Sequence, residues 1–254
     1  MNGLLNLFFP LFDALDAGLG FLPPVLRVAL FGVLSGALTM AVYRWSSNQE
    51  KIRHHKEEAR RIRRALGAAA EDLSETLRLT RANLAVSLRL LGTVTGPALL
   101  ASLPILFVIV WVATRYGWEP PPPASPVGIT FEPARDGVVV EPEGALLEDG
   151  GEPVLRWPAT AGEIRFRDAE GVIYVGPPPE PGADVVHKPR WWNLLLGNEM
   201  GYLREDAAIE AIRFELAPRR LIPVGPGWLT GWEAVYFGSL LIASLLLKIA
   251  FRID

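Results

Sequence analysis

Three long stretches of the chain are almost purely apolar, and strongly polar segments separate them. They run from about Pro24 to Tyr43, from about Val94 to Thr114 and from about Trp232 to Phe251. A helix rises about 1.5 Å per residue, so about 20 apolar residues cross the ~30 Å hydrocarbon layer of a bilayer. The pattern predicts an α-helical membrane protein with three spans.

The polar segment between the first two spans, residues 44–92, has apolar residues at coiled-coil spacing. Two series are separated by intervals of three, four and seven: Trp45, Ile52, Ala59, Ile62 and Leu66, then Leu73, Leu77, Leu84, Leu88 and Leu91. Both series match a and d positions. Gly67 suits a helix end and the Glu71-Asp72 pair suits a helix start. We therefore expect a helical hairpin that packs through both series.

The segment between the second and third spans, residues 115–228, has short runs of alternating apolar and polar residues. A Pro-rich spacer precedes runs at 128–131, 138–141, 163–167, 172–175 and 208–216. Gly and Pro separate these runs, which predicts a small antiparallel β sandwich. The segment from Trp191 to Leu196 interrupts the alternation. Two interpretations stay open for it, a place at the membrane interface or burial in the sandwich.

Residues 1–23 precede the first span and contain the apolar run Leu4–Phe12, followed by Asp13 and Asp16. This composition predicts an amphipathic helix on the outer bilayer surface. The stretch has no Lys or Arg, unlike a secretory signal, so we expect it to be retained. The chain is thus divided into an interfacial helix (1–23), a span (24–43), a hairpin (44–92), a span (93–114), a β domain (115–228) and a last span with a short tail (229–254).

Charge is unevenly distributed between the two connecting segments. Residues 44–92 hold eleven basic and six acidic residues, a net charge of +5, whereas residues 115–228 hold eleven basic and eighteen acidic residues, a net charge of −7. Short loops rich in Lys and Arg stay in the cytoplasm. We therefore expect a multi-pass protein of the cell (inner) membrane, with a cytoplasmic hairpin and C-terminus and an extracytoplasmic N-terminus and β domain.

Composition narrows the range of chemistry. The 254 residues include no cysteine, which excludes disulfides, thiolate metal sites and a cysteine nucleophile. His54 and His55 are adjacent, unlike the i, i+4 histidine pair of a helical zinc site. No phosphate-binding glycine loop or nucleophile elbow is present. We expect no enzyme activity, no metal and no cofactor.

The spans contain a few small polar residues that could line a shared hydrophilic groove: Ser35, Thr39, Ser102 and Ser244. The alternative is that each hydroxyl bonds back to its own helix, which is common in apolar helices. Gly32 and Gly36 form a small-xxx-small pattern, which we interpret as a helix-packing site.

Two groups of charged residues are further candidates. Arg27 and Glu233 lie near the outer ends of the first and third spans, where they would either pair or extend separately to the interface. Arg60, Arg61, Arg63 and Arg64 cluster near the tip of the expected hairpin. They would face anionic lipid or dock an acidic partner such as a ribosome. No aromatic residues interleave them, so sequence-specific nucleic-acid recognition is not expected.

The order of elements resembles a known family. A membrane helix is followed by a basic helical segment starting at Tyr43-Arg44-Trp45-Ser46, and then by a second span that reads Gly96-Pro97-Ala98-Leu99-Leu100-Ala101-Ser102-Leu103-Pro104-Ile105. This order is similar to the core of the YidC/Oxa/Alb superfamily of membrane-protein insertases. The three-span plan is similar to its reduced members, the archaeal YidC-like proteins and the insertase subunit of the ER membrane protein complex. Bacterial members carry an arginine midway along the first core helix, whereas Ser35 lies there in this chain.

The resemblance implies a protein that eases client segments into the bilayer through a hydrophilic groove between its spans. Its expected partners are the lipid bilayer, nascent membrane proteins and the ribosome. The competing hypothesis is a non-catalytic anchor or scaffold whose β domain binds an envelope protein.

Overall fold

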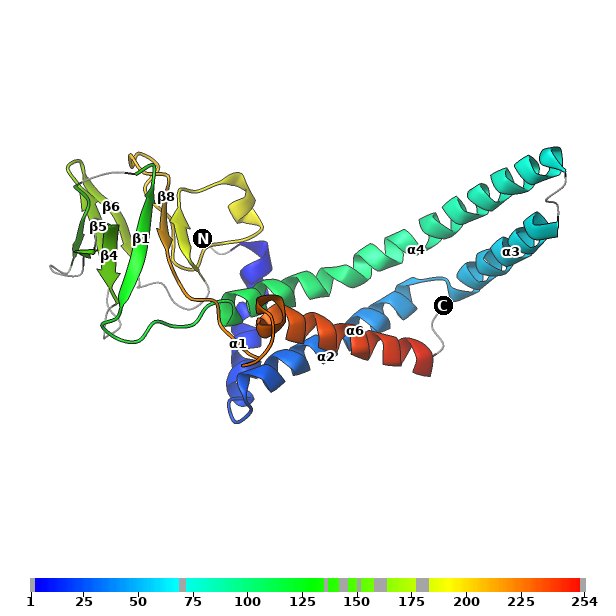
Figure 1. Ribbon diagram of the computed structural model, residues 1–254, viewed down its shortest axis with the longest axis horizontal. Coiled ribbons are helices and arrows are strands. Elements are labelled where there is room, and N and C mark those ends of the chain that lie inside the picture. The colour runs from blue at the N-terminus through cyan, green and yellow to red at the C-terminus, as the bar shows by residue number, and fades with distance from the viewer. Residues whose placement is uncertain are drawn as a thin grey trace. The chain divides into compact units, whose positions relative to one another are not determined.

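The computed structural model describes residues 3–68, 72–134, 137–141, 146–149, 152–157, 164–176 and 183–251. Its helices are η1 (Leu4–Phe8), α1 (Phe9–Gly18), α2 (Pro24–Ser46), α3 (Gln49–Ala68), α4 (Leu73–Tyr116), α5 (Gly227–Thr230) and α6 (Trp232–Ala250) (Figure 1). The chain forms two compact units, which are described separately. One comprises Met1–Val28 with Phe107–Val235, and the other comprises Ala29–Leu106 with Tyr236–Asp254.

Three helices, α2, α4 and α6, are long and apolar enough to cross a membrane. Many of their large apolar side chains are exposed, including Leu38 on α2, Leu99 on α4 and Ile242 on α6. Apolar side chains on the outside of a helix are favourable where the solvent is lipid. The prediction of three apolar helices suited to a membrane is confirmed.

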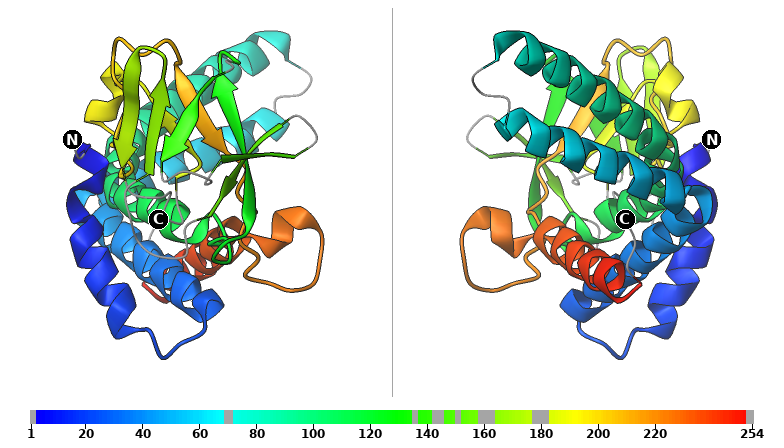
Figure 2. Two further views of the ribbon diagram at one scale, coloured as in Figure 1. Left: turned by 90° about the vertical axis from the view of Figure 1, so that its left-hand side faces the viewer. Right: turned by 90° about the vertical axis from the view of Figure 1, so that its right-hand side faces the viewer.

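Helix α3 and the first half of α4 run side by side as a helical hairpin (Figures 1 and 2). Of the first predicted series, Ile52 and Ala59 are buried as expected, whereas Trp45 is 84% exposed. The second series was assigned to the wrong face of its helix. The buried apolar residues of that arm are Leu79 and Val86, and the five predicted leucines are all exposed. The reversal was predicted between Gly67 and the Glu71-Asp72 pair. α3 ends at Ala68 and α4 begins at Leu73, and residues 69–71 between them lie outside the described residues.

Helix α4 continues without interruption from the hairpin into the apolar span, over 44 residues. A proline in a helix interior normally kinks or ends the helix, yet Pro97 and Pro104 both lie inside this one helix. Proline removes one backbone donor but does not end a helix whose remaining turns are well bonded. The hairpin arm and the span are therefore parts of one element.

The β region contains two antiparallel sheets. Its strands are β1 (Pro126–Glu132), β2 (Val139–Glu141), β3 (Leu146–Asp149), β4 (Glu152–Arg156), β5 (Ile164–Asp168), β6 (Gly171–Gly176), β7 (Val185–His187) and β8 (Ala211–Phe214). The five-stranded sheet has the order β3-β4-β1-β8-β7 and the three-stranded sheet the order β2-β5-β6. Buried side chains of both sheets, among them Ile129, Phe166 and Phe214, form one hydrophobic core. The prediction of a β region between the second and third apolar helices is thus confirmed.

Alternation identified some strands and missed others. β1, β2, β5 and β6 fall on predicted runs, and β8 occupies the middle of the run at 208–216. β3, β4 and β7 were not predicted, because they are short and β4 contains Pro153. Trp191–Leu194 forms the 3-10 helix η2, in which Trp191 is 80% exposed. Burial of this segment in the sandwich, one of the two open interpretations, is therefore wrong.

The N-terminal segment forms η1 and α1, with Leu4, Leu7 and Leu11 exposed on one face. Within its unit the segment packs on the last turns of α4, where the rings of Phe8 and Phe107 lie 5.0 Å apart. It also joins the loop after η2, because the Leu5 amide donates to the Leu195 carbonyl at 2.8 Å.

Candidate functional site

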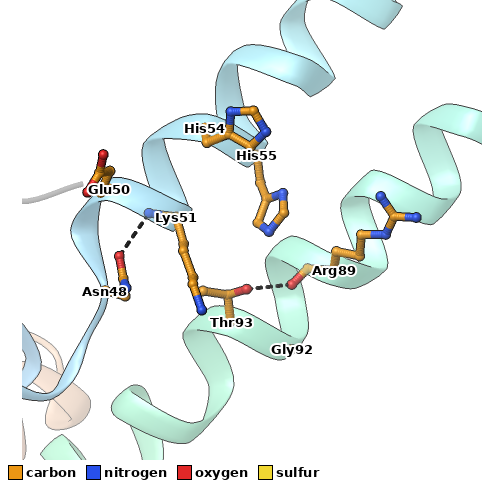
Figure 3. A pocket seen from close by; sticks show the side chains of 8 residues that line it. All are labelled: Asn48, Glu50, Lys51, His54, His55, Arg89, Gly92 and Thr93. Atoms are coloured by element: carbon orange, nitrogen blue, oxygen red, sulfur yellow. Dashed lines mark hydrogen bonds between the residues drawn. The ribbon is translucent and has the colours of Figure 1, made fainter.

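A polar cleft lies at the base of the helical hairpin, between the start of α3 and α4 (Figure 3). Its volume is about 740 Å³, and most of the residues that line it have polar or charged side chains: Asn48, Glu50, Lys51, His54, His55, Arg89, Gly92 and Thr93. Asn48 ends the connection from α2, and its side chain accepts a hydrogen bond of 3.0 Å from the Lys51 amide. The cleft therefore sits where α2 and the apolar part of α4 give way to the hairpin.

The chemistry of the cleft is mainly cationic. Lys51 and His55 extend from α3 toward α4, and the carboxylate of Glu50 points away from Thr93 (Figure 3). Nδ1 of His55 is buried with no hydrogen-bond partner among the described residues, and the nearest Glu58 oxygen is 3.8 Å away. Buried polar atoms in folded proteins are normally hydrogen-bonded. The cleft thus offers a buried nitrogen that a polar group can satisfy.

A close-packed seam joins α2 to α6 in the same unit. A Cβ at Gly32 would collide with Ser239 Oγ and lie 2.5 Å from the Tyr236 carbonyl, and a Cβ at Gly36 would lie 2.7 Å from the Leu240 carbonyl. Only glycine allows backbones to approach so closely. The interpretation of the small-xxx-small pattern as a packing site is therefore confirmed.

The four proposed groove residues have different surroundings. Ser35 is buried and accepts a hydrogen bond of 2.9 Å from the Tyr236 hydroxyl. Ser244 Oγ lies near Gly36 and is buried without a partner in the described part of the chain. Thr39 and Ser102 donate to carbonyls of their own helices, at 2.7 Å each. The structure thus brings Ser35 and Ser244 to the α2–α6 seam and leaves Ser102 on α4.

The structure gives Arg27 a different partner from Glu233. Its guanidinium pairs with Asp16 of α1 at 2.6 Å, and the tyrosyl hydroxyl of Tyr116 also donates to Asp16, at 2.5 Å. Glu233 instead lines a cavity of about 410 Å³ together with Trp118, among other residues. Of the two alternatives for Arg27 and Glu233, pairing with each other is therefore wrong, because Arg27 pairs with Asp16.

Asp13 makes a second ion pair near this one. Arg115 of α4 binds the Asp13 carboxylate through two nitrogens, each at 2.9 Å, and Trp111 donates to the same carboxylate at 2.8 Å. The hydrogen bond from Arg115 lowers the pKa of Asp13 below its ordinary value. Arg115 also pairs with Glu199 of the β region at 2.5 Å. These contacts tie α1, the end of α4 and the β region together.

The arginine cluster lies near the tip of the hairpin. Arg60, Arg61, Arg63 and Arg64 are all exposed on α3. At about 1.5 Å per residue, Arg60 and Arg64 lie roughly 17 and 22 Å along the helix from its first residue, Gln49. The cluster is thus well separated from the cleft at the hairpin base.

Sequence reasoning missed the cleft and the acidic partners of Arg27 and Arg115. The sequence did carry a signal for the acidic partners, since Asp13 and Asp16 interrupt an otherwise apolar stretch. Charges in such surroundings are normally paired. Among the described residues, no group of three or more His, Cys, Asp or Glu side chains could hold a metal ion.

Comparisons with protein-family models, with curated proteins and with solved structures found no match to this chain.

Proposed function

We propose that the protein is an insertase-like or chaperone-like membrane protein that eases transfer of client segments into the bilayer. The observation that carries this proposal is the polar cleft at the point where α4 passes from the hairpin into its apolar span. A polar client segment pays a large desolvation cost in lipid. A hydrated cleft at the edge of the spans reduces that cost at the first step of transfer.

The proposal includes a membrane orientation. The basic hairpin lies in the cytoplasm, and the N-terminus and the acidic β domain lie outside, as the charge bias of the loops favours. The arginine cluster then projects roughly 20 Å from the start of α3. This exceeds the ~8 Å Debye length at physiological salt, so attraction to lipid headgroups is screened. A soluble acidic partner, such as a ribosome, fits the cluster better than the bilayer does.

Site-specific photocrosslinking tests the proposal. A photoreactive residue at Thr93, in the cleft, or at Ser102, about two and a half turns further along α4, should capture a nascent membrane protein with a short polar outer segment. The matched control is Leu241, a 64% exposed position on α6 that suits contact with lipid. Equal capture at Leu241 and Thr93 would show that clients do not prefer the cleft to the lipid-facing surface, and the proposal would fail.

The second candidate is a non-catalytic anchor or scaffold that presents the β domain to an envelope partner. The close contact of Gly32 and Gly36 with α6 favours it, because this seam leaves no room for water between those two helices. In a scaffold, crowding the proposed groove with Leu at Thr39 and Ser102 would change stability only. In an insertase, the same changes would slow client insertion beyond the loss of folded protein.

A further inference from the structure

The five leucines misassigned to the hairpin core form an exposed stripe along α4. Leu73, Leu77, Leu84, Leu88 and Leu91 are between 51% and 74% exposed. The face that packs against α3 carries the buried Leu79 and Val86 instead. We call this set of five residues the leucine stripe. It presents a row of large apolar side chains that nothing in the described part of the chain covers.

The leucine stripe continues onto the membrane-spanning part of the same helix. Leu99, Leu103 and Leu106 are also exposed, by 44% to 65%. From Leu73 to Leu106, successive members are three, four, seven or eight residues apart, which keeps them on one side of a helix. Because α4 is one continuous helix, the apolar surface runs from the hairpin into the bilayer-spanning segment.

The dimensions and spacing of the stripe fit one kind of partner. Leu73 to Leu91 is a rise of about 27 Å at 1.5 Å per residue, close to the ~30 Å that a membrane-spanning helix needs. The intervals of three, four and seven are those through which one α-helix packs against another. The stripe is not suited to lie flat on the bilayer surface, since it belongs to α4, the same continuous helix that crosses the bilayer.

We propose that the leucine stripe binds the apolar helical segment of a client membrane protein and guides it along α4 to the bilayer. This inference rests on the proposed function and names the surface that the client's apolar part uses, whereas the cleft serves its polar part. Continuity of the stripe with the exposed leucines of the span lets a bound segment exchange protein contacts for lipid without exposure to water.

Crosslinking of the full-length protein in proteoliposomes tests the site of binding. A photoreactive residue replaces Leu84, and the control position is Glu57, which is exposed on α3. The probes are ribosome-stalled chains with a 20-residue Leu/Ala segment or the same segment with half of its leucines changed to Ser. The Leu84 position should capture the apolar chain about tenfold more than the Ser-containing chain, and Glu57 should not discriminate. Capture of a second copy of this protein in place of the client would overturn the proposal.

Insertion rates separate this proposal from the proposed function. The triple variant Leu77→Ser, Leu84→Ser, Leu88→Ser should insert the apolar client about tenfold more slowly and keep its thermal stability, because all three side chains are exposed. The control variant Leu194→Ser, Val224→Ser, which removes exposed apolar side chains elsewhere, should insert at the normal rate. Normal insertion by the triple variant would overturn the leucine stripe and leave the insertase standing. If the unaltered protein inserted no client, the proposed insertase function would be overturned. The crosslinking result at Leu84 would then decide by itself whether the leucine stripe binds apolar segments.

Discussion

The Tyr236 hydroxyl donates a hydrogen bond of 2.9 Å to the Ser35 hydroxyl and thereby joins α6 to α2. Both side chains are buried, 0% and 4% exposed respectively. In an apolar environment an unpaired hydroxyl is costly, so this bond aligns the two helices in one register.

A double-mutant cycle measures that bond. We expect Tyr236→Phe and Ser35→Ala each to destabilise the protein, and the double variant to lose less than their sum. The coupling free energy should be about 0.6–1.5 kcal/mol, the range for hydrogen bonds between membrane helices. Unfolding in mixed detergent micelles provides the measurement. Additive losses within about 0.3 kcal/mol would show that the two hydroxyls do not interact.

The glycine seam should be intolerant of even one methyl group. Gly32→Ala places a Cβ against Ser239 and the Tyr236 carbonyl, so we expect a loss of about 1–3 kcal/mol in the free energy of unfolding. Gly238→Ala is the matched control, because a Cβ there meets nothing within 4 Å. It should be neutral or stabilise α6 by about 0.5–1 kcal/mol. Equal effects of the two changes would contradict a close-packed α2–α6 seam.

Acid should weaken the attachment of α1. The pKa of Asp13 is lowered by its hydrogen bond with Arg115, so the ionised carboxylate is favoured in the folded state. Its contribution is therefore complete above the unfolded-state pKa of about 3.9 and is lost as the pH falls through the lower folded-state pKa. The Asp13 side chain is 41% exposed, which limits the effect to about 1 kcal/mol or less. Asp13→Asn should be less stable than the unaltered protein at pH 7 and equal to it near pH 2.

Single cysteines provide a direct test of orientation in a chain that has none. Ser74 lies at the start of α4 in the hairpin and Ser125 just before β1. With an impermeant thiol reagent on intact cells, we expect labelling of Ser125→Cys and protection of Ser74→Cys. Labelling of both after permeabilisation serves as the control. Labelling of Ser74→Cys with protection of Ser125→Cys would show that the orientation is opposite to the proposed one.

Charge reversal tests the tip of the hairpin. Changing Arg60, Arg61, Arg63 and Arg64 to Glu should abolish co-purification with ribosomes or another acidic partner, and salt should weaken the binding of the unaltered protein. The four side chains are exposed, so folding should be preserved. If the variant still bound the partner and salt did not weaken this binding, the arginine cluster would have no part in partner binding.

The apolar pattern predicted the helices well because length and composition suffice to identify a membrane span. It located the β region too, where strands such as β1 and β5 alternate clearly. Heptad spacing was less informative. It correctly marked Leu77 and Leu84 as one face of a helix, but spacing does not tell whether a neighbouring helix covers that face. The covered face holds Leu79 and Val86, seven residues apart and fewer in number.

The candidate site could be predicted only in part. Ser35 was identified, whereas its partner Tyr236 is 201 residues away and has no local signal. The Asp13–Arg115 pair also has no local signal, because the two residues are 102 positions apart. The cleft also escaped prediction, since it depends on the alignment of α3 beside α4, which the sequence pattern does not fix.

The two prolines inside α4 have a mechanical consequence. Each removes the backbone hydrogen bond to the carbonyl four residues earlier. Pro97 and Pro104 are seven residues apart, so both missing bonds lie on the same side of the helix. We therefore expect α4 to be most compliant there and to bend in a preferred direction, while the glycine seam keeps α2 and α6 together as a stiff pair. Binding of a partner to the hairpin would then tilt α4, while α2 and α6 keep their positions relative to each other.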